Sequence, residues 1–199
     1  MTRIAVLGTG AVARTLADPL VAAGHSLTFG SRRPTGPVTT HADAVARADV
    51  VVNALPGDAA VDVIPGLPLR PGAVLVDVAN AVHTGPDGFA TGLRHPGSSL
   101  AEELAAVLPG VRVVKTLNTM HVRLMARPPA AVTAFLSGDD AGAKDVTRVL
   151  LTDLGWPSSQ VIDLGGLSTA RWTEAFVLAV APAVRVLGPV PFGLAIAGA

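Results

Sequence analysis

The sequence has no cysteine and no net charge. Without cysteine the 199-residue chain can form no disulfide, thiolate nucleophile or cysteine-ligated metal site, and a reducing cytoplasm is the location we expect for it. Its 15 basic and 15 acidic residues balance, and neither sign is concentrated in a block. Nucleic acids and membrane surfaces attract a concentrated basic field, so we expect neither as a partner.

Long uninterrupted apolar runs are also missing. The N-terminal MTRIAVLGTG has too few apolar residues before its glycines for a signal peptide. Residues 176–199 are mostly apolar, but Arg185, prolines and glycines interrupt them, whereas a membrane span needs about 20 apolar residues in a row. We expect this tail to pack on the sheet rim or across a homodimer interface, because it is too apolar to stand free in water.

Short apolar runs of strand length are frequent in this chain, of which half the residues are apolar. They fall at residues 4–7, 26–29, 50–53, 74–78, 111–115, 132–136 and 161–164. Helix-like segments separate them, and continuous apolar strands that alternate with helices are typical of a parallel sheet covered on both faces. The pattern predicts an α/β fold with a doubly wound, mostly parallel sheet.

The segments between these strands predict helices and loops. Val12, Leu16 and Leu20 repeat at helical spacing, and Pro19 predicts a bend in that helix. Further helices are expected at 99–108, 139–154 and 168–187, the last with a kink at Pro182. Residues 34–40 and 84–99, rich in Gly and Pro, are expected to be loops.

The strongest motif is a glycine-rich turn at the end of the first strand. It reads Gly8-Thr9-Gly10-Ala11-Val12-Ala13, a G-x-G-x-x-A pattern that opens the first helix. Gly8 permits a tight turn, Gly10 lets a pyrophosphate approach the backbone, and Ala13 lets the helix lie close to the strand. The N–H groups at the helix N-terminus would face the phosphates. The alternative is a glycine turn with a purely structural role.

The end of the second strand predicts which dinucleotide is bound. An NAD site has an acidic residue there, but this chain has Ser31, Arg32 and Arg33. A serine hydroxyl and two guanidinium groups suit the extra 2′-phosphate of NADP. We therefore predict NADP(H) as cofactor; the alternative is that the arginines form an ordinary solvated turn.

Other candidate residues lie where later strands end, at the edge where ligands bind in this fold class. Asn53, Ala54, Leu55 and Pro56 follow the third strand and are expected to line the adenosine ribose and pyrophosphate. The fourth strand ends at Asp77-Val78-Ala79-Asn80, where Ala79 and Asn80 are candidate cofactor contacts. Capping of a loop is an equal alternative for Asp77 and Asn80.

Several segments together give the chain a family resemblance. IAVLGTG, FGSRRP, VVKTLNTM and GDD…LGW…GGLSTAR, in this order over residues 3–175, resemble the NADP-dependent oxidoreductases of the 5-deazaflavin coenzyme F-420. A related reductase domain occurs in mammalian six-transmembrane metalloreductases. The resemblance implies hydride transfer between nicotinamide C4 and deazaflavin C5, which needs proximity and orientation more than an acid or base. Accordingly, no catalytic triad or carboxylate pair is evident in the sequence.

The resemblance also implies roles for individual residues. Ser31 and Arg32 match the family's 2′-phosphate grip, whereas Pro34 and the loop after it replace the basic residues often found there. Lys115, Asn118 and Thr119 match VVK-x-x-N-T and are expected near the nicotinamide.

The five histidines show no metal-ligand spacing, and no metal is expected. His121 is the one we place nearest to the reacting rings, with an ordinary loop histidine as the alternative. We expect residues 1–166 to form the NADP-binding domain and residues 167–199 to form a helical segment that closes the cleft or makes a dimer interface.

Other functions remain open at this point. One is an NADPH reductase of small carbonyl, imine or flavin substrates, although the carbonyl and imine enzymes append a helical domain of roughly 100 residues that this chain has no room for. Another is a non-catalytic NADP sensor, which would keep the turn and the arginines but lack a second pocket.

Overall fold

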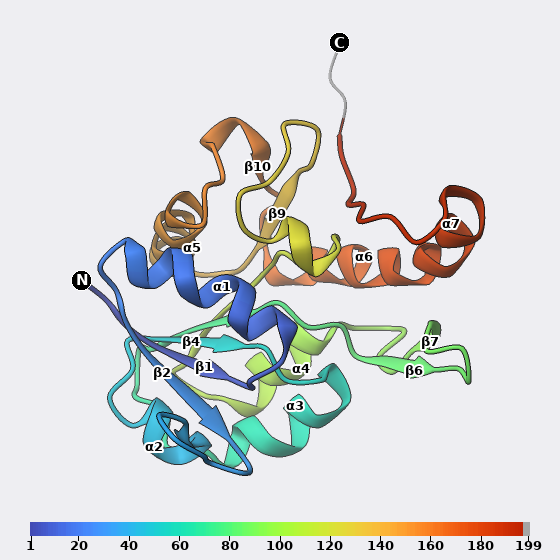
Figure 1. Ribbon diagram of the computed structural model, residues 1–199. Coiled ribbons are helices and arrows are strands. Elements are labelled where there is room, and N and C mark those ends of the chain that lie inside the picture. Colours follow the sequence, from blue (N-terminus) through green and yellow to red (C-terminus); the bar gives the residue numbers. More distant parts are fainter. Residues whose placement is uncertain (197–199) are drawn as a thin grey trace.

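The structure of the chain, a computed structural model, describes residues 1–196 (Figure 1). The strands are β1 (Arg3–Leu7), β2 (Ser26–Ser31), β3 (Thr39–Thr40), β4 (Val50–Asn53), β5 (Val74–Asp77), β6 (Val82–Thr84), β7 (Ala90–Leu93), β8 (Arg112–Thr116), β9 (Ala134–Ser137) and β10 (Val161–Asp163). The α-helices are α1 (Ala11–Ala22), α2 (His41–Val45), α3 (Gly57–Val63), α4 (Leu100–Val107), α5 (Ala141–Asp153), α6 (Ala170–Ala175) and α7 (Val180–Leu187). Short 3₁₀ turns are η1 (Ile64–Gly66), η2 (Val122–Leu124), η3 (Ser158–Gln160), η4 (Leu167–Thr169) and η5 (Phe176–Ala179).

One sheet of eight strands organises the molecule, in the order β10-β9-β8-β5-β4-β1-β2-β3. All its pairs are parallel except β8 with β9. The run β3-β2-β1-β4-β5-β8 has the strand order of a dinucleotide-binding fold, which changes direction between β1 and β4. The predicted doubly wound, mostly parallel sheet is confirmed, and its ligand-binding crevice is expected at the carboxyl ends of β1 and β4.

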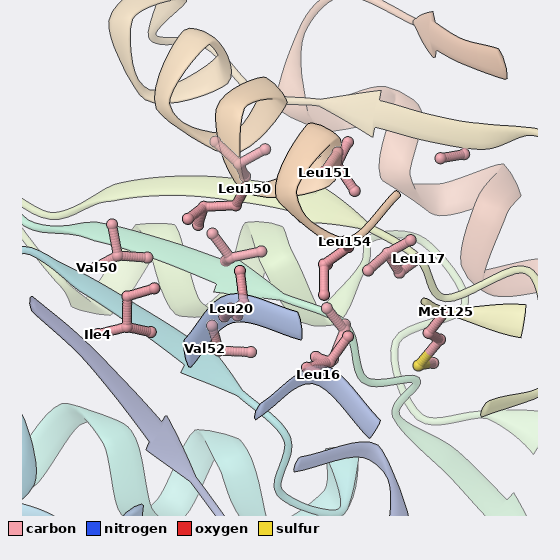
Figure 2. Packing of buried hydrophobic residues seen from close by; sticks show 14 of the residues in the cluster. Ile4, Leu16, Leu20, Val50, Val52, Leu117, Met125, Leu150, Leu151 and Leu154 are labelled. Atoms are coloured by element: carbon pink, nitrogen blue, oxygen red, sulfur yellow. The ribbon is translucent and has the colours of Figure 1, made fainter. Parts of the chain in front are cut away.

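Two apolar cores cover the two faces of the sheet, because successive strand residues point to opposite sides. Ile4 and Val6 of β1 face one core, and Ala5 and Leu7 face the other. Helices α1 and α5 cover the first face, where Leu16 and Leu20 of α1 and Leu150 and Leu151 of α5 belong to the same core as Ile4 and Val52 (Figure 2). Helices α2, α3 and α4 lie on the second face (Figure 1). Helix α1 continues through Pro19.

One predicted loop is wrong. The antiparallel hairpin β6–β7 runs from Val82 to Leu93 and so occupies much of the predicted loop 84–99. Its turn is Gly85-Pro86-Asp87-Gly88, in which Gly88 has φ +81° and the N–H of Gly85 donates to the carbonyl of Phe89 at 2.8 Å. Proline, aspartate and glycine in this order favour a tight turn between two strands. The loop was predicted from the Gly and Pro content of the segment, which does not distinguish a hairpin turn from a loop. The predicted loop 34–40 likewise ends in the short edge strand β3.

The C-terminal segment is helical, as the prediction for residues 168–187 required, but it is interrupted before Pro182. Helix α6 passes into the 3₁₀ turn η5 and then into α7. Pro182 has no N–H to donate to the carbonyl four residues earlier, and its ring crowds that carbonyl, so the change falls in the preceding turn. Figure 1 shows α7 at the same end of the molecule as the β6–β7 hairpin.

Both tryptophans pack within the fold. Trp156 is buried and its indole N–H donates to the carbonyl of Met125 at 2.9 Å. Trp172 is 41% exposed and its ring meets the edge of Phe135, with ring centroids 5.0 Å apart. Neither arrangement indicates a stacking platform for a ligand.

Candidate functional site

The glycine-rich turn lies at the predicted crevice, between the ends of β1 and β4. Gly8 has φ +108°, and a Cβ on it would lie 2.7 Å from the carbonyl oxygen of Ala54. The turn is anchored by hydrogen bonds from the N–H of Gly8 to the carbonyl of Gly30 and from the N–H of Ala54 to the carbonyl of Leu7. Glycine at position 8 is therefore required by the protein's own backbone.

Gly10 differs from Gly8 in this respect. Its φ is −74°, and a Cβ on it would meet no protein atom within 4 Å. Packing therefore does not explain the glycine, whereas close approach of a phosphate would. Gly10 is the N-cap of α1 and no side chain caps that end, so the first N–H groups of a 12-residue helix face outward without helical partners. Ala13 is fully buried, as close packing of α1 on the sheet requires.

The residues predicted to bind the 2′-phosphate stand at the end of β2. Ser31 is the last residue of this strand, and its hydroxyl accepts a hydrogen bond from the N–H of Arg33 at 3.1 Å. The side chains of Arg32 and Arg33 are exposed, and neither has an ion-pair partner within residues 1–196. Two unengaged guanidinium groups on one turn form a local positive field suited to a dianion.

A histidine that sequence reasoning did not select lies beneath this turn. His41 is only 8% exposed, and its Nδ1 has no hydrogen-bond partner within the described part of the chain. A Cβ on Gly30 would come within 3.0 Å of that Nδ1, so the ring packs directly under the end of β2. Burial, and then the charge of Arg32, lowers the pKa of His41. In the sequence, the only nearby feature that reflects this contact is the glycine at position 30, where a larger residue would crowd the ring.

The strand ends in the middle of the sheet carry a buried polar network. The amide of Asn53 donates to Asp77 at 2.8 Å, and the N–H groups of Leu55 and Ala79 donate to Asn53 and Asp77. The ammonium of Lys115 donates to Asp77 at 2.8 Å and also to the carbonyl of Ala79. These bonds fix the loops after β4 and β5 relative to each other.

Two residues of this network, Asn53 and Lys115, were predicted from the sequence to belong to the cofactor site. Asn53 is 0% exposed and Lys115 is 1% exposed, and both polar groups are engaged within the protein. That Asn53 lines the cofactor site and that Lys115 lies near the nicotinamide stay predictions, and the structure shows that both side chains already have partners within the protein. Buried amide and ammonium groups must be paired, and the pairing depends on neighbouring strands that the sequence does not identify. The partly buried Ala54, Leu55 and Ala79 remain at the rim, next to the exposed Pro56.

Two asparagines join the ends of β5 and β8. The amide of Asn118 donates to Asn80 Oδ1 at 2.9 Å, and that of Asn80 donates to the carbonyl of Asn118 at 3.0 Å. The turn that brings them together passes through Leu117, a buried non-glycine residue with φ +59°. Such a backbone conformation is costly for leucine and is over-represented at functional sites.

A cleft of about 310 Å³ opens beside these asparagines. One wall is polar and comes from the sheet rim, and the other is apolar and comes largely from the C-terminal segment. The lining residues are Asn80, Phe89, Asn118, Met120, His121, Phe176, Val177, Val180, Val184, Pro189, Val190 and Phe192. Small-molecule pockets commonly have this size and this mixture of apolar surface with a few polar groups.

The C-terminal tail is held against the loop after β8. The N–H of His121 donates to the carbonyl of Phe192 at 2.8 Å, and that of Leu194 donates to Thr119 at 2.9 Å. His121 itself is exposed and lines the cleft, with Nδ1 accepting from the N–H of Arg123. Residues 192–194 of the tail thus pack on the loop after β8, at the sheet rim. Residues 197–199 of the predicted tail lie outside the described residues.

Sequence reasoning also missed Glu174 and Gly57. Glu174 of α6 is 3% exposed and accepts a hydrogen bond from Lys115 at 2.6 Å. A Cβ on Gly57 would lie 2.2 Å from the carbonyl oxygen of Asn80, so α3 can approach the loop after β5 only with glycine there. A glutamate in a helical, Ala-rich stretch and a glycine after a proline look ordinary in sequence, because their partners are distant along the chain.

The described residues lack two other kinds of site. Across residues 1–196 there is no cluster of three or more histidine or acidic side chains placed to hold a metal ion. None of the helices in this part of the chain has both the length and the apolarity to cross a membrane.

Comparison with known proteins relates this arrangement to one family. The family model described as "NADP oxidoreductase coenzyme F420-dependent" matches residues 3–81. A crystal structure from Arthrobacter sp. FB24, assigned as an F420-dependent NADP-reductase, is 35% identical, covers 100% of both chains and superposes with a TM-score of 0.89. The hypothetical protein SMa0349 from Sinorhizobium meliloti is 28% identical over 85% of this chain and 88% of its own, with a TM-score of 0.71.

More distant relatives are longer than this chain. Metalloreductase STEAP3 of Rattus norvegicus is 28% identical over 203 residues, which are 96% of this chain but 40% of the relative. The chain thus spans about two-fifths of the length of the curated relatives it matches. A reductive aminase from Aspergillus terreus, 19% identical with a TM-score of 0.67, shares the fold alone. The full-length similarity at 35% identity, together with the family-model match, shows that this chain belongs to the family of coenzyme F420-dependent NADP oxidoreductases.

Proposed function

We propose that the protein transfers a hydride between NADP(H) and the deazaflavin coenzyme F-420. The observation that carries the proposal is the cleft of about 310 Å³ beside Asn80 and Asn118. It lies at the carboxyl ends of β5 and β8, on the same edge of the sheet as the glycine-rich turn. A second pocket continuous with that edge is what a two-substrate oxidoreductase needs and what a simple NADP sensor would lack.

The residues present fit NADP. Gly10 has open space above its Cα, the N-terminus of α1 offers free N–H groups, and Arg32 and Arg33 are unengaged within residues 1–196. We infer that Gly8 to Val12 hold the pyrophosphate and that Ser31, Arg32 and Arg33 hold the 2′-phosphate. The rim loops at Ala54–Pro56 and Ala79–Asn80 would flank the ribose and nicotinamide. The bound nicotinamide supplies or accepts the hydride.

The cleft provides what hydride transfer requires from the protein. Its apolar wall, formed by residues such as Phe176, Val177 and Val180, excludes water and offers a flat aromatic ring a surface to pack on. The opposite asparagines offer amide donors and acceptors that fix ring orientation. His121 brings an imidazole to the lining of the cleft, and we infer that it holds or releases the proton that accompanies deazaflavin reduction.

Spectroscopy can test this proposal directly. Purified protein is mixed with NADPH and oxidised F-420, and the loss of F-420 absorbance is followed against NADPH oxidation. We expect stoichiometric hydride transfer, and calorimetry should show NADPH binding at least about 100-fold tighter than NADH because of the 2′-phosphate contacts. Equal affinity for the two nucleotides would contradict the assignment of the arginines.

The same assay separates the alternative functions. Turnover with FMN or FAD but not with F-420 would support a flavin reductase on the same fold. Tight NADPH binding without turnover on deazaflavin, flavin, quinone, carbonyl or imine acceptors would support a sensor. The metalloreductase activity of the longer relatives is not proposed for this chain, because the chain spans only about two-fifths of their length.

We further propose that the protein is a cytoplasmic homodimer. The location rests on the absence of cysteine. The dimer rests on apolar side chains that remain exposed near the C-terminus: Val186 is 85% exposed, Leu187 57% and Val190 51%. Burial of these side chains across a two-fold axis would remove them from water. Light scattering of the parent and of Val186→Glu should show a dimer and a monomer; a monomeric parent would contradict the proposal.

A further inference from the structure

A buried ion triad lies beneath the cleft. Lys115 Nζ is 2.8 Å from Asp77 Oδ2 and 2.6 Å from Glu174 Oε1. The three side chains are 1%, 0% and 3% exposed, and Glu174 Oε1 also accepts from the N–H of Leu100 at 2.9 Å. Lys115 and Asp77 belong to adjacent strands of the sheet, whereas Glu174 belongs to α6. The triad is therefore a tertiary link between the sheet and the C-terminal segment.

The two sides of this link carry the two walls of the cleft. On the sheet side, Lys115 also donates to the carbonyl of Ala79, the residue before Asn80, and Asn118 follows Lys115 after one turn. On the helix side, Glu174 is directly followed by the segment that contributes Phe176 and Val177 to the apolar wall. Hence the position of Glu174 relative to Lys115 sets the separation of the polar and apolar walls.

Stability alone gives a weak reason for such a triad. Removing charges from water costs several kcal/mol per ion, and apolar replacements of buried ion pairs are often neutral or stabilising. The two carboxylates also repel each other across one ammonium group. A buried pairing with defined geometry is better explained by the specific arrangement it imposes on the elements it joins.

We propose that Glu174 is a positioning residue that fixes the width of the acceptor cleft by its reach to Lys115. The inference rests on the proposed function insofar as the cleft receives the hydride acceptor, a flat deazaflavin or flavin ring. Glu174 does not contact the acceptor. It acts by holding α6 and η5 at the distance at which the apolar wall can cover that ring, so a change in reach of one methylene shifts the wall.

Two variants test the length and the charge of the Glu174 side chain separately. Glu174→Asp keeps the charge and shortens the side chain, whereas Glu174→Gln keeps the length and an oxygen acceptor but removes the charge. We expect Glu174→Asp to raise the KM for F-420 about tenfold and Glu174→Gln about threefold, because small displacements of positioning groups have large kinetic effects. The Kd for adenosine 2′,5′-bisphosphate, which occupies only the far end of the site, should stay within about twofold of the parent for both.

A second ion pair that also starts from α6 provides a matched control. Arg171 of α6 pairs with Glu102 of α4 at 2.6 Å on the surface, away from the cleft. Glu102→Gln removes a comparable charge and should leave the KM for F-420 unchanged. Thermal melts of all variants, with kinetics measured well below each Tm, separate loss of folding from loss of positioning.

The outcomes decide the inference as follows. An unchanged KM in folded Glu174→Asp, or a larger effect of Glu174→Gln than of Glu174→Asp, overturns it. If Glu174→Asp does not fold, Glu174→Gln decides alone, and a KM equal to that of the parent overturns the inference. If the parent itself does not reduce F-420, the proposed function fails. In that case the variants are compared with FMN as acceptor, or by NADPH fluorescence, where a selective change still supports the positioning role.

Discussion

The two ends of the candidate site are built in opposite ways. At the adenosine end, the residues from Gly8 to Ala13 and from Ser31 to Arg33 are contiguous in sequence, and both arginines are exposed with no ion-pair partner among residues 1–196. At the cleft end, Asn80, Asn118 and the C-terminal segment come from three distant parts of the chain. The groups beneath them are buried and already paired.

The comparison teaches how each end is expected to respond to mutation. Exposed groups without partners in the protein can be removed with little cost to folding, so changes to the exposed arginines at the adenosine end should affect binding alone. Buried, mutually bonded groups at the cleft end contribute to folding and positioning at once. Changes there should alter stability together with catalysis, and the following experiments measure this difference from the largest expected effect to the smallest.

Removal of both guanidinium groups should give the largest effect. Arg32→Ala combined with Arg33→Ala is expected to weaken NADPH binding about 100-fold or more, because each charge-assisted hydrogen bond contributes about 1.5–3 kcal/mol. NADH affinity and Tm should hardly change. Calorimetric titration with both nucleotides measures the difference. Arg47→Ala, at an exposed arginine on the opposite edge of the sheet, is the control.

The two glycines of the turn should separate folding from binding. Gly8→Ala places a Cβ 2.7 Å from the carbonyl of Ala54 at a positive φ and should destabilise the fold by about 2–4 kcal/mol. Gly10→Ala meets no protein atom within 4 Å, so its stability should stay within about 1 kcal/mol of the parent while NADPH affinity falls about tenfold. Urea unfolding and NADPH titration measure the two quantities. Equal stability of both variants would show that the clash at Gly8 is relieved by movement of the loop.

The asparagine pair should show mixed behaviour. Asn118→Ala removes the donor to Asn80 Oδ1 and should cost about 1 kcal/mol of stability. With Asn80 less constrained, kcat/KM for the acceptor should fall about tenfold, while binding of adenosine 2′,5′-bisphosphate stays unchanged. Steady-state kinetics and a thermal melt test both parts. Unaltered kinetics would place the reacting rings elsewhere.

The smallest expected effect is a change of stability with pH. Burial raises the pKa of Glu174 above its ordinary value, with Lys115 opposing and Asp77 reinforcing the shift. Between the ordinary and the raised pKa the folded protein holds a proton that the unfolded chain has released, so stability falls as pH rises through this window. Glu174→Gln has no such proton. The stability advantage of the parent over this variant should therefore narrow as pH rises above the ordinary pKa of a glutamate.

Glu102 provides a control of opposite sign. The hydrogen bond from Arg171 lowers the pKa of Glu102, so its contribution to stability is present above the ordinary pKa and is lost as pH falls. The advantage of the parent over Glu102→Gln should widen as pH rises. Parallel slopes for the two variants in urea titrations would contradict the assigned directions.

The sequence alone predicted the sheet and the adenosine end of the site. Continuous apolar strands and the G-x-G-x-x-A turn are local patterns, and the structure has the strands within a few residues of the predicted positions. The arginines after β2 needed no distant partner to be recognised. Gly10 is an example. A Cβ there would contact no other part of the chain, so we explain the glycine by the approach of a ligand.

Only the tertiary structure decided the rest. The hairpin β6–β7, the burial of Lys115 and its ion pair with Glu174 depend on which distant segments pack together. Lys115 matched a family motif, yet its ammonium group pairs with a neighbouring strand and with a helix 59 positions along the chain. A buried charge needs a counter-charge nearby, and the fold decides which residue supplies it. The spacing of residues in the sequence does not identify that partner.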